Sequence, residues 1–226
     1  MVLEAAMTMR SCLMVTCLLS AIAAKGYSLS CIECMSQEGT ICNGTSKVCS
    51  SGDDSCISTY ILTSMGGMEI AKMYIRQCAP NKLCSKTGSI SLPNGRIKTG
   101  TTCCKTNDCT PANPVLPSDS NEKNGLSCKT CFTPNSKSCD TNLLTDCLGS
   151  ETTCINQLTT RTGKVPTSTV VRGCSTKEMC EPAHQVWHLG EMTILLENTC
   201  TNRGVHVQPS LLLAIISLGL IWKSSC

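Results

Sequence analysis

Aromatic and charged side chains are scarce in this sequence. Aromatic residues make up 3% of the 226 residues, and Phe132 is the sole phenylalanine, which excludes a large aromatic core. Charged residues make up 15%, the net charge is +3, and no basic run is interleaved with aromatics, so no nucleic-acid partner is indicated. The apolar runs at the chain ends, residues 12–24 and 211–222, are shorter than the roughly 20 residues of a membrane-spanning helix.

Catalytic residue types are equally scarce. The chain has three histidines and no G-x-S-x-G motif, so no nucleophile can be paired with a general base, and neither an enzyme nor a cofactor is predicted. His184 and His188 have the spacing of a helical metal site, but their segment is predicted to be a hairpin, which favours exposed hairpin residues. Asp53 and Asp54 lack calcium-loop spacing, which favours a solvated turn.

Cysteine is the residue that the chain has in excess. With 21 cysteines in 226 residues, the fraction of cysteine approaches that of small disulfide-bonded domains. Such domains bury too little apolar surface to fold without their disulfides. The C-x-x-C pairs Cys31/Cys34 and Cys128/Cys131 are compatible with zinc or redox motifs, but further ligands at suitable spacing and an activating helix are missing. Structural disulfides are therefore predicted, and no metal site.

The N-terminus has the pattern of a secretory signal. Arg10 precedes the apolar stretch 12–24, and small residues follow it, so residues 1–28 are predicted to be a signal peptide cleaved before Leu29. Residues 21–23 form the competing cleavage site. Secretion places the remaining chain in an oxidising compartment, where clustered cysteines form disulfides.

The C-terminus has the layout of a glycolipid-anchor signal. Small residues, a polar spacer and an apolar tail follow one another, with Asn202 as the candidate attachment residue and residues 203–226 as the removed propeptide. The polar ending, residues 223–226, is atypical of such tails, and the alternative is secretion with the tail retained. The predicted location is extracellular in both cases, either secreted or anchored to the outer face of the plasma membrane.

The 18 cysteines left after removal of signal and tail form one pattern written twice. Ten lie in residues 29–110 and eight in residues 125–202, and a linker rich in proline, serine and asparagine, residues 111–124, separates them. The first copy contains Cys31, Cys34, Cys42, Cys49, Cys56, Cys78, Cys84, Cys103, Cys104 and Cys109. The second contains Cys128, Cys131, Cys139, Cys147, Cys154, Cys174, Cys180 and Cys200.

The long gaps between cysteines predict β-hairpins, and no helical period is evident. Turns are indicated at Gly66-Gly67, at Asn94-Gly95 and around Gly163. The predicted strand pairs are residues 56–63 with 70–78, 85–92 with 96–103, and 154–160 with 168–174.

The ordered cysteines of the first copy, ending in the adjacent pair Cys103-Cys104 with Cys109 five residues on, resemble the urokinase-receptor and lymphocyte-antigen-6 family of three-finger domains. The resemblance implies a small disulfide-rich all-β fold with two tandem three-finger domains. The pairs that it implies are Cys31 with Cys56, Cys34 with Cys42, Cys49 with Cys78, Cys84 with Cys103, Cys104 with Cys109, Cys128 with Cys154, Cys131 with Cys139, Cys147 with Cys174, and Cys180 with Cys200.

The second copy departs from the family pattern, because Thr201 stands where the adjacent cysteine belongs and no later cysteine closes the last loop. In this asymmetry the chain resembles the gamma-type phospholipase A2 inhibitors more closely than the three-domain urokinase receptor. Two short segments add to the resemblance: Asn124-Gly125 before the second C-x-x-C, and Arg172-Gly173-Cys174. Amphibian sodefrin-precursor-like pheromone factors share the same plan.

A few residues outside the cysteine framework are candidate sites. Asn43 opens an N-x-T acceptor for N-glycosylation on a loop. Trp187 is predicted to lie exposed on a hairpin, where tryptophan often anchors an interface, and Tyr60 and Tyr74 are further contact candidates. The alternative is that all three side chains cover sheet faces.

The leading functional hypothesis is a non-enzymatic extracellular module that binds a protein partner through rigid hairpins. The resemblance implies a secreted phospholipase A2 as that partner, with this chain as its inhibitor. The alternatives are a glycolipid-anchored, receptor-like ligand binder and a secreted pheromone-like signalling factor, because fold alone does not separate these functions. Membrane contact is expected only through the lipid anchor.

Overall fold

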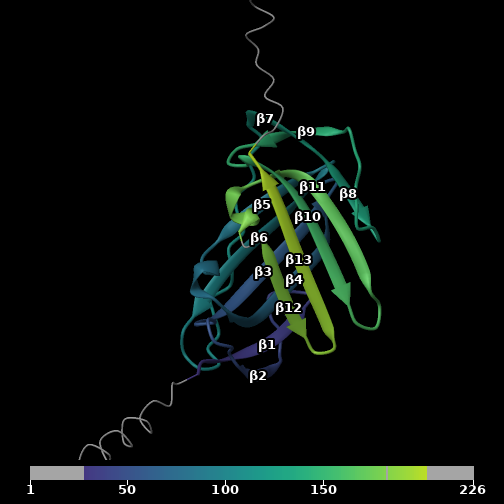
Figure 1. Ribbon diagram of the computed structural model, residues 1–226. Helices are drawn as coiled ribbons and strands as arrows, with labels where there is room; N and C mark the ends of the chain where they lie inside the picture. Colours follow the sequence, from purple (N-terminus) through teal and green to yellow (C-terminus); the bar gives the residue numbers. More distant parts are fainter. Residues whose placement is uncertain (1–27, 182, 203–226) are drawn as a thin grey trace, which may run out of the picture.

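A computed structural model describes residues 28–181 and 183–202, and in this part of the chain the protein is almost entirely β-structure (Figure 1). Neither of the two short 3-10 helices found there is long or apolar enough to cross a membrane. The elements are β1 (Ser30–Ser36), β2 (Thr45–Val48), β3 (Ser55–Met65), β4 (Met68–Ala79), η1 (Asn81–Leu83), β5 (Thr87–Leu92), β6 (Gly95–Cys104), β7 (Lys123–Lys129), β8 (Cys131–Pro134), β9 (Leu144–Leu148), β10 (Thr153–Thr162), β11 (Thr167–Ser175), η2 (Lys177–Cys180), β12 (His184–Leu189) and β13 (Met192–Thr201).

The predicted hairpins are confirmed. β3 pairs with β4, β5 with β6, and β10 with β11, each antiparallel. Their turns use the expected residues: Gly66 and Gly67 have φ of 59° and 81°, and Asn94 has φ of 60°, a left-handed conformation that glycine and asparagine adopt at low cost. The segment after η2 forms a further hairpin, β12 with β13.

Nine disulfides join the cysteines of the two copies at the bases of these hairpins. Thr201 lies opposite Cys154 in the β10–β13 register, the place that Cys104 takes opposite Cys56 in the β3–β6 register. The chain is therefore two tandem three-finger domains, of which the second lacks the closing bridge. The pairs, the same as those implied by the family resemblance, are Cys31–Cys56, Cys34–Cys42, Cys49–Cys78, Cys84–Cys103, Cys104–Cys109, Cys128–Cys154, Cys131–Cys139, Cys147–Cys174 and Cys180–Cys200.

One sheet runs through both domains. Its order is β12-β13-β10-β11-β5-β6-β3-β4-β1-β2, and β8 pairs with β11 beside this path. The two domains join where β11 pairs with β5, with Cys174 opposite Ser91 and Ser175 opposite Ile90. Figure 1 shows the consequence: the sheet bends so that β10 to β13, in green and yellow, cross in front of β3 to β6.

Much of the apolar core lies between the domains rather than within either one. One buried cluster combines Ile90, Leu92 and Ile97 of the first domain with Ile155 and Val171 of the second. In the structure the domains are packed, and these side chains of both domains are buried against one another.

A buried carboxylate lies at the junction of the two domains. Glu151, 2% exposed, accepts hydrogen bonds at Oε1 from the hydroxyls of Ser89 (3.0 Å) and Ser91 (2.8 Å), both on β5. Its Oε2 accepts the backbone N–H of Leu148 at 3.2 Å. A buried polar group is costly unless it is hydrogen-bonded, so these three donors make the junction specific as well as tight.

The linker lies along β6 instead of hanging free. Asp119 forms ion pairs with Arg96 at 2.5 Å and with Lys98 at 2.7 Å, and the hydroxyl of Thr102 donates to the carbonyl of Ala112. A Cβ at Gly100 would stand 2.3 Å from the carbonyl oxygen of Val115, so only glycine permits this approach. The linker is thus a fixed strap across the first domain.

Candidate binding sites

The tip of the β3–β4 hairpin exposes apolar side chains. Met68 is 70% exposed and Ile70 53% exposed, and they alternate with Glu69, which forms an ion pair with Lys72. The hairpin is fixed at its base by the Cys31–Cys56 and Cys49–Cys78 bridges. Exposed apolar residues on a rigid hairpin lose little conformational freedom on association, so this tip is a candidate surface for a protein partner.

The predicted exposure of Trp187 is wrong. The side chain is 4% exposed and packs with Ile75 and Ile194, while Ile61 and Met73 lie against the same cluster. The reason is the interdomain packing: the second domain lays β12 and β13 over β3 and β4, which covers the face of β12 that carries the indole. Trp187 therefore contacts the first domain of its own chain.

The two tyrosine candidates lie opposite each other across β3 and β4. Tyr74 is 2% exposed, and its hydroxyl is 2.9 Å from the hydroxyl of Ser58, so it is a core residue in this structure. Tyr60 is partly buried. Because side chains alternate along a strand, both tyrosines lie on the face opposite to Thr59 and Ile75, which face the second domain.

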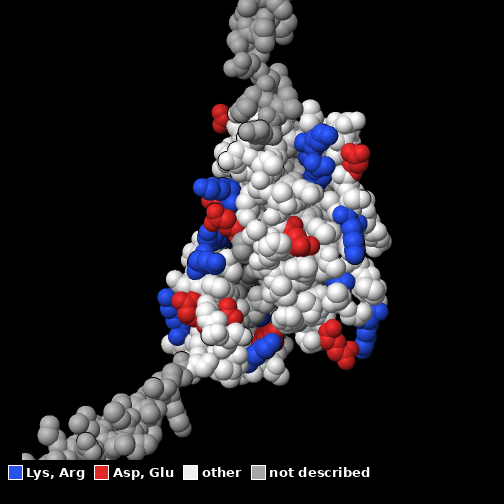
Figure 2. Space-filling view, viewed as in Figure 1, with Lys and Arg blue, Asp and Glu red and all other residues white. Residues whose placement is uncertain are grey.

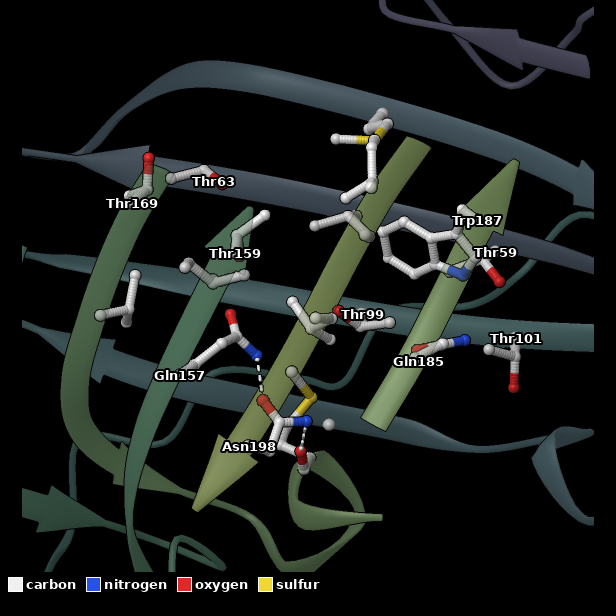
Figure 3. Close-up of a pocket in the computed structure, with 18 of the residues that line it drawn as sticks. Thr59, Thr63, Thr99, Thr101, Gln157, Thr159, Thr169, Gln185, Trp187 and Asn198 are labelled. Atoms are coloured by element: carbon white, nitrogen blue, oxygen red, sulfur yellow. Dashed lines mark hydrogen bonds between the residues drawn. The ribbon is translucent and has the colours of Figure 1, made fainter. Parts of the chain in front are cut away.

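A cavity of about 370 Å³ lies between the two layers of strands. Its walls carry threonines from both domains, including Thr59, Thr99, Thr159 and Thr169, which Figure 3 shows facing the space from crossing strands. Apolar side chains fill much of the remaining lining: Met35, Ile57, Ile61, Met73, Ile97, Val171, Trp187, Met192, Ile194 and Leu196. The volume falls in the range of about 300–1,000 Å³ typical of small-molecule sites.

Two polar features of the cavity wall differ in their hydrogen bonding. Gln157 donates from Nε2 to Oδ1 of Asn198 at 2.9 Å, and Nδ2 of Asn198 donates to the carbonyl of Met179 at 3.0 Å, so this amide pair is bonded within the protein (Figure 3). Trp187 differs: its Nε1 is the one buried side-chain polar atom without a hydrogen-bond partner among the described residues. Sequence reasoning singled out this tryptophan, but for exposure and not for a free donor.

The histidine and aspartate pairs have no metal or catalytic geometry. His184 and His188 are exposed on β12, where four residues of extended strand separate them by about 13 Å, too far to share an ion. Burial raises the pKa of the Asp53 carboxyl, and the adjacent Asp54 adds to this rise, but no nucleophile accompanies the pair. The triads Cys31/Cys49/Cys78 and Cys128/Cys147/Cys174 consist of disulfide-bonded cysteines, which are not thiolate ligands.

The surface carries charges of both signs. Figure 2 shows lysine and arginine interspersed with aspartate and glutamate over the visible face, without a field of one sign. Asn43 is exposed beside Cys42, as an acceptor for a glycan must be. Asn202 is the last described residue and is exposed, whereas the predicted signal peptide and anchor propeptide lie outside the described residues.

The family model for the u-PAR/Ly-6 domain matches residues 27–112 and 124–204. A phospholipase A2 inhibitor of the gamma type from Gloydius brevicaudus siniticus is 27% identical over 173 residues, which cover 73% of this chain and 82% of the relative. The inhibitor of the same name from Laticauda semifasciata is 28% identical over 156 residues, 67% of this chain and 84% of the relative.

A shorter match joins this chain to a receptor. The urokinase plasminogen activator surface receptor of Aotus trivirgatus is 31% identical over 116 residues, which cover 47% of this chain and 33% of the receptor. Among solved structures, mouse TEX101 covers 75% of this chain at 16% identity, with a TM-score of 0.35 over 97% of its own length. That score is too low to carry an argument.

Proposed function

Because this chain belongs to the u-PAR/Ly-6 domain family, we propose that it is a non-enzymatic extracellular binding protein and that it binds a secreted phospholipase A2 through the β3–β4 finger tip. The observation that carries the proposal is the pair of exposed apolar side chains, Met68 and Ile70, on a hairpin stapled at its base. The partner class comes from the two phospholipase A2 inhibitor relatives, whose matches extend over most of their own length.

The interdomain packing favours this function physically. A protein that presents several hairpins from one continuous sheet keeps their relative positions fixed before the partner arrives, which lowers the entropy cost of association. The junction at Glu151 and the strap held by Asp119 contribute to this rigidity. Inhibition then follows from occupying the enzyme surface and needs no chemistry by this chain.

The test is binding and inhibition with a panel of purified secreted phospholipases A2. The wild-type protein is expected to inhibit at least one of them stoichiometrically, and the double variant Met68→Ser/Ile70→Ser is expected to lose about tenfold or more in affinity. Val115→Ser is the matched control, because Val115 is 74% exposed but lies on the linker. Unchanged inhibition by the tip variant, or no inhibition of any enzyme by the wild type, contradicts the proposal.

A second candidate function is a lipid-anchored ligand binder of the receptor type. The 31% identity to the urokinase receptor segment favours it, together with the sequence pattern around Asn202. Treatment of expressing cells with a phosphatidylinositol-specific phospholipase is expected to release such a protein. Spontaneous accumulation in the medium, together with phospholipase A2 inhibition, would favour the soluble inhibitor instead.

A further inference from the structure

A groove lies where the two ends of the large sheet come together. The strands β12 and β2 are the first and the last of its path, and residues of both line this groove, which is about 310 Å³ in volume and open to solvent. Its floor includes Gln77, Cys78 and Ala79, at the end of β4 that is remote from the finger tip. The groove is therefore separate from the tip at Met68 and Ile70, to which the proposed phospholipase A2 binding is assigned.

One wall of the groove is the free edge of a strand. In the described part of the chain β12 has a single sheet neighbour, β13, and Figure 1 shows it at the margin of the second domain. The N–H of Asn198 donates to the carbonyl of Ala183 at 2.7 Å, and from there hydrogen-bonded pairs alternate with non-bonded pairs along the hairpin. The backbone groups that point away from β13 are therefore those of His184, Val186 and His188, and these three residues also line the groove.

The edge of β12 carries none of the usual devices against pairing. Natural edge strands are kept apart by lysine, proline, bulges or short length. β12 has six residues without lysine or proline, and it pairs with β13 in an unbroken register. The other end of the sheet, β2, has only four residues, and its Lys47 forms an ion pair with Glu33 at 2.9 Å. β12 is thus the edge that is open to an added strand.

The groove suits a single extended segment without charge. An extended backbone supplies the row of donors and acceptors that a strand edge needs. Val48 and Val186, 65% and 46% exposed, offer apolar contacts from the two strands that line the groove. Neither sign of charge is in excess, because the lining holds two acids and two lysines: Glu33, Asp53, Lys47 and Lys82.

A second copy of this chain fits the edge less well. Because the indole of Trp187 packs on Ile75 of β4, β12 lies over the first domain, and the groove floor projects beyond the strand edge. Two copies joined edge to edge would bring two such floors together on one side of the joined sheet. A single strand rests on one floor.

We propose that the groove binds an extended, uncharged segment of a partner protein, which adds a strand beside β12. Directly opposite residues of an antiparallel pair have their side chains on the same face. The residue opposite Val186 therefore directs its side chain to solvent, and its two neighbours direct theirs to the floor. The floor at Ala79 and the Cys49–Cys78 bridge is apolar, which favours valine-sized side chains at these two positions. This binding does not depend on the proposed phospholipase A2 function.

The test uses the secreted protein and a synthetic probe, the fluorescein-labelled peptide Thr-Val-Thr-Val-Thr with blocked termini. Saturable binding at one site per chain is expected in fluorescence polarisation. The N–H of the central threonine donates to the carbonyl of Val186 in the proposed complex, so a methyl group on that nitrogen is expected to weaken binding about tenfold or more. The matched control carries the methyl group on the nitrogen of the first valine, which faces away from β12, and its affinity is expected to change by less than about twofold.

Two variants of the protein test the location. Val186→Pro removes an N–H that makes no bond to β13, and proline is tolerated at such edge positions, so about tenfold weaker binding with unchanged thermal unfolding is expected. Val186→Thr keeps the N–H and is expected to bind the peptide as the wild type does.

Three results would overturn the proposal: no saturable binding to the wild type, equal affinity of the two methylated peptides, or wild-type affinity of Val186→Pro. The methylated peptides are compared on the wild-type protein, so this comparison decides even if Val186→Pro unfolds. A concentration-dependent dimer in sedimentation that Val186→Pro abolishes would also overturn the proposal, because it would assign the edge to a second copy.

Discussion

The two domains repeat one plan but differ in the contacts made at equivalent positions. Arg76 and Arg172 both stand two residues before a cysteine of the middle hairpin, opposite Cys34 and Cys131 in their registers. Arg76 donates to the carbonyl of Cys109 at 2.9 Å and so holds the loop that the Cys104–Cys109 bridge closes. The second domain has no such loop, and its arginine donates at 3.1 Å to the carbonyl of Cys139.

The second domain contacts the first through residues that differ from those at the equivalent positions of the first domain. Gly173 precedes Cys174 where Gln77 precedes Cys78, and a Cβ at Gly173 would stand 1.9 Å from the carbonyl oxygen of Ser91. Glu151 occupies the place of Asp53, three residues before the cysteine that opens the middle hairpin. The difference teaches that the first domain is closed by its own disulfide, whereas the second is completed by contact with the first.

Loss of a central disulfide is expected to have the largest effect on stability and secretion. The effect is expected to be larger in the second domain than in the first. The Cys147–Cys174 and Cys49–Cys78 bridges span 27 and 29 residues, and each contributes about 3–4 kcal/mol to the free energy of unfolding in the chain-entropy model. With three bridges left, the Cys147→Ser/Cys174→Ser variant is expected to fail secretion. The Cys49→Ser/Cys78→Ser variant retains four bridges and is expected to be secreted at reduced yield.

The short closing bridge provides the control for this comparison. Cys104→Ser/Cys109→Ser makes the first domain four-bridged like the second, and because the bridge spans five residues it contributes only about 2 kcal/mol. Secretion yields and thermal unfolding of the three variants give the ranking. Equal yields for all three would show that the second domain is not the weaker unit.

Glu151→Ala is expected to have the next largest effect on stability, because it removes a hydrogen-bond acceptor at the junction of the two domains. The variant leaves the hydroxyls of Ser89 and Ser91 and the N–H of Leu148 without their acceptor, at a cost of about 1–3 kcal/mol in the free energy of unfolding. Asp53→Ala, at the equivalent position of the first domain, is the matched control. Burial raises the pKa of Asp53, so its carboxylate opposes folding at neutral pH, and its removal is expected to be neutral or slightly stabilising.

Thermal unfolding and small-angle scattering distinguish a weakened junction from a weakened domain. Glu151→Ala is expected to lower the transition temperature and to increase the radius of gyration, since the domains separate before they unfold. A drop of the same size in Asp53→Ala would mean that the acidic position serves each domain alone.

The hairpins were predictable from the sequence because their signals are local. Gly66-Gly67 and Asn94-Gly95 supply left-handed turn residues between strand-forming runs, and the cysteine order specifies the family whose fold follows. The junction had no such signal. Glu151 sits in a short polar segment that reads as a turn, and its partners Ser89 and Ser91 lie 62 and 60 residues away.

Trp187 was misjudged for the same physical reason. Alternation along β12 places the indole on one face and His184, Val186 and His188 on the other, and this much is visible in the sequence. Which of the two faces is covered depends on how the second domain docks on the first. That packing rests on contacts between distant segments, which local patterns do not encode.

The smallest expected effect concerns the linker strap and its pH dependence. Hydrogen bonds from Lys98 and Arg96 lower the pKa of Asp119 below its ordinary value of 3.8, against the opposing effect of burial. A carboxyl whose pKa is lowered by folding contributes stability above its unfolded pKa and loses that contribution as the pH falls through its folded pKa. The contribution is therefore expected to be complete above about pH 4 and to disappear below it.

The size of this contribution to stability is below about 1 kcal/mol, because the Asp119 side chain is 61% exposed. The measurement is the rate of cleavage of residues 111–124 by an acid-active protease as the pH is lowered: the wild-type linker is expected to be cleaved at most about fivefold faster below this range than above it. Asp119→Asn is expected to be cleaved at the faster rate at every pH tested, and identical profiles for the two proteins would show that the strap is held by the contact of the Val115 backbone with Gly100 and not by charge.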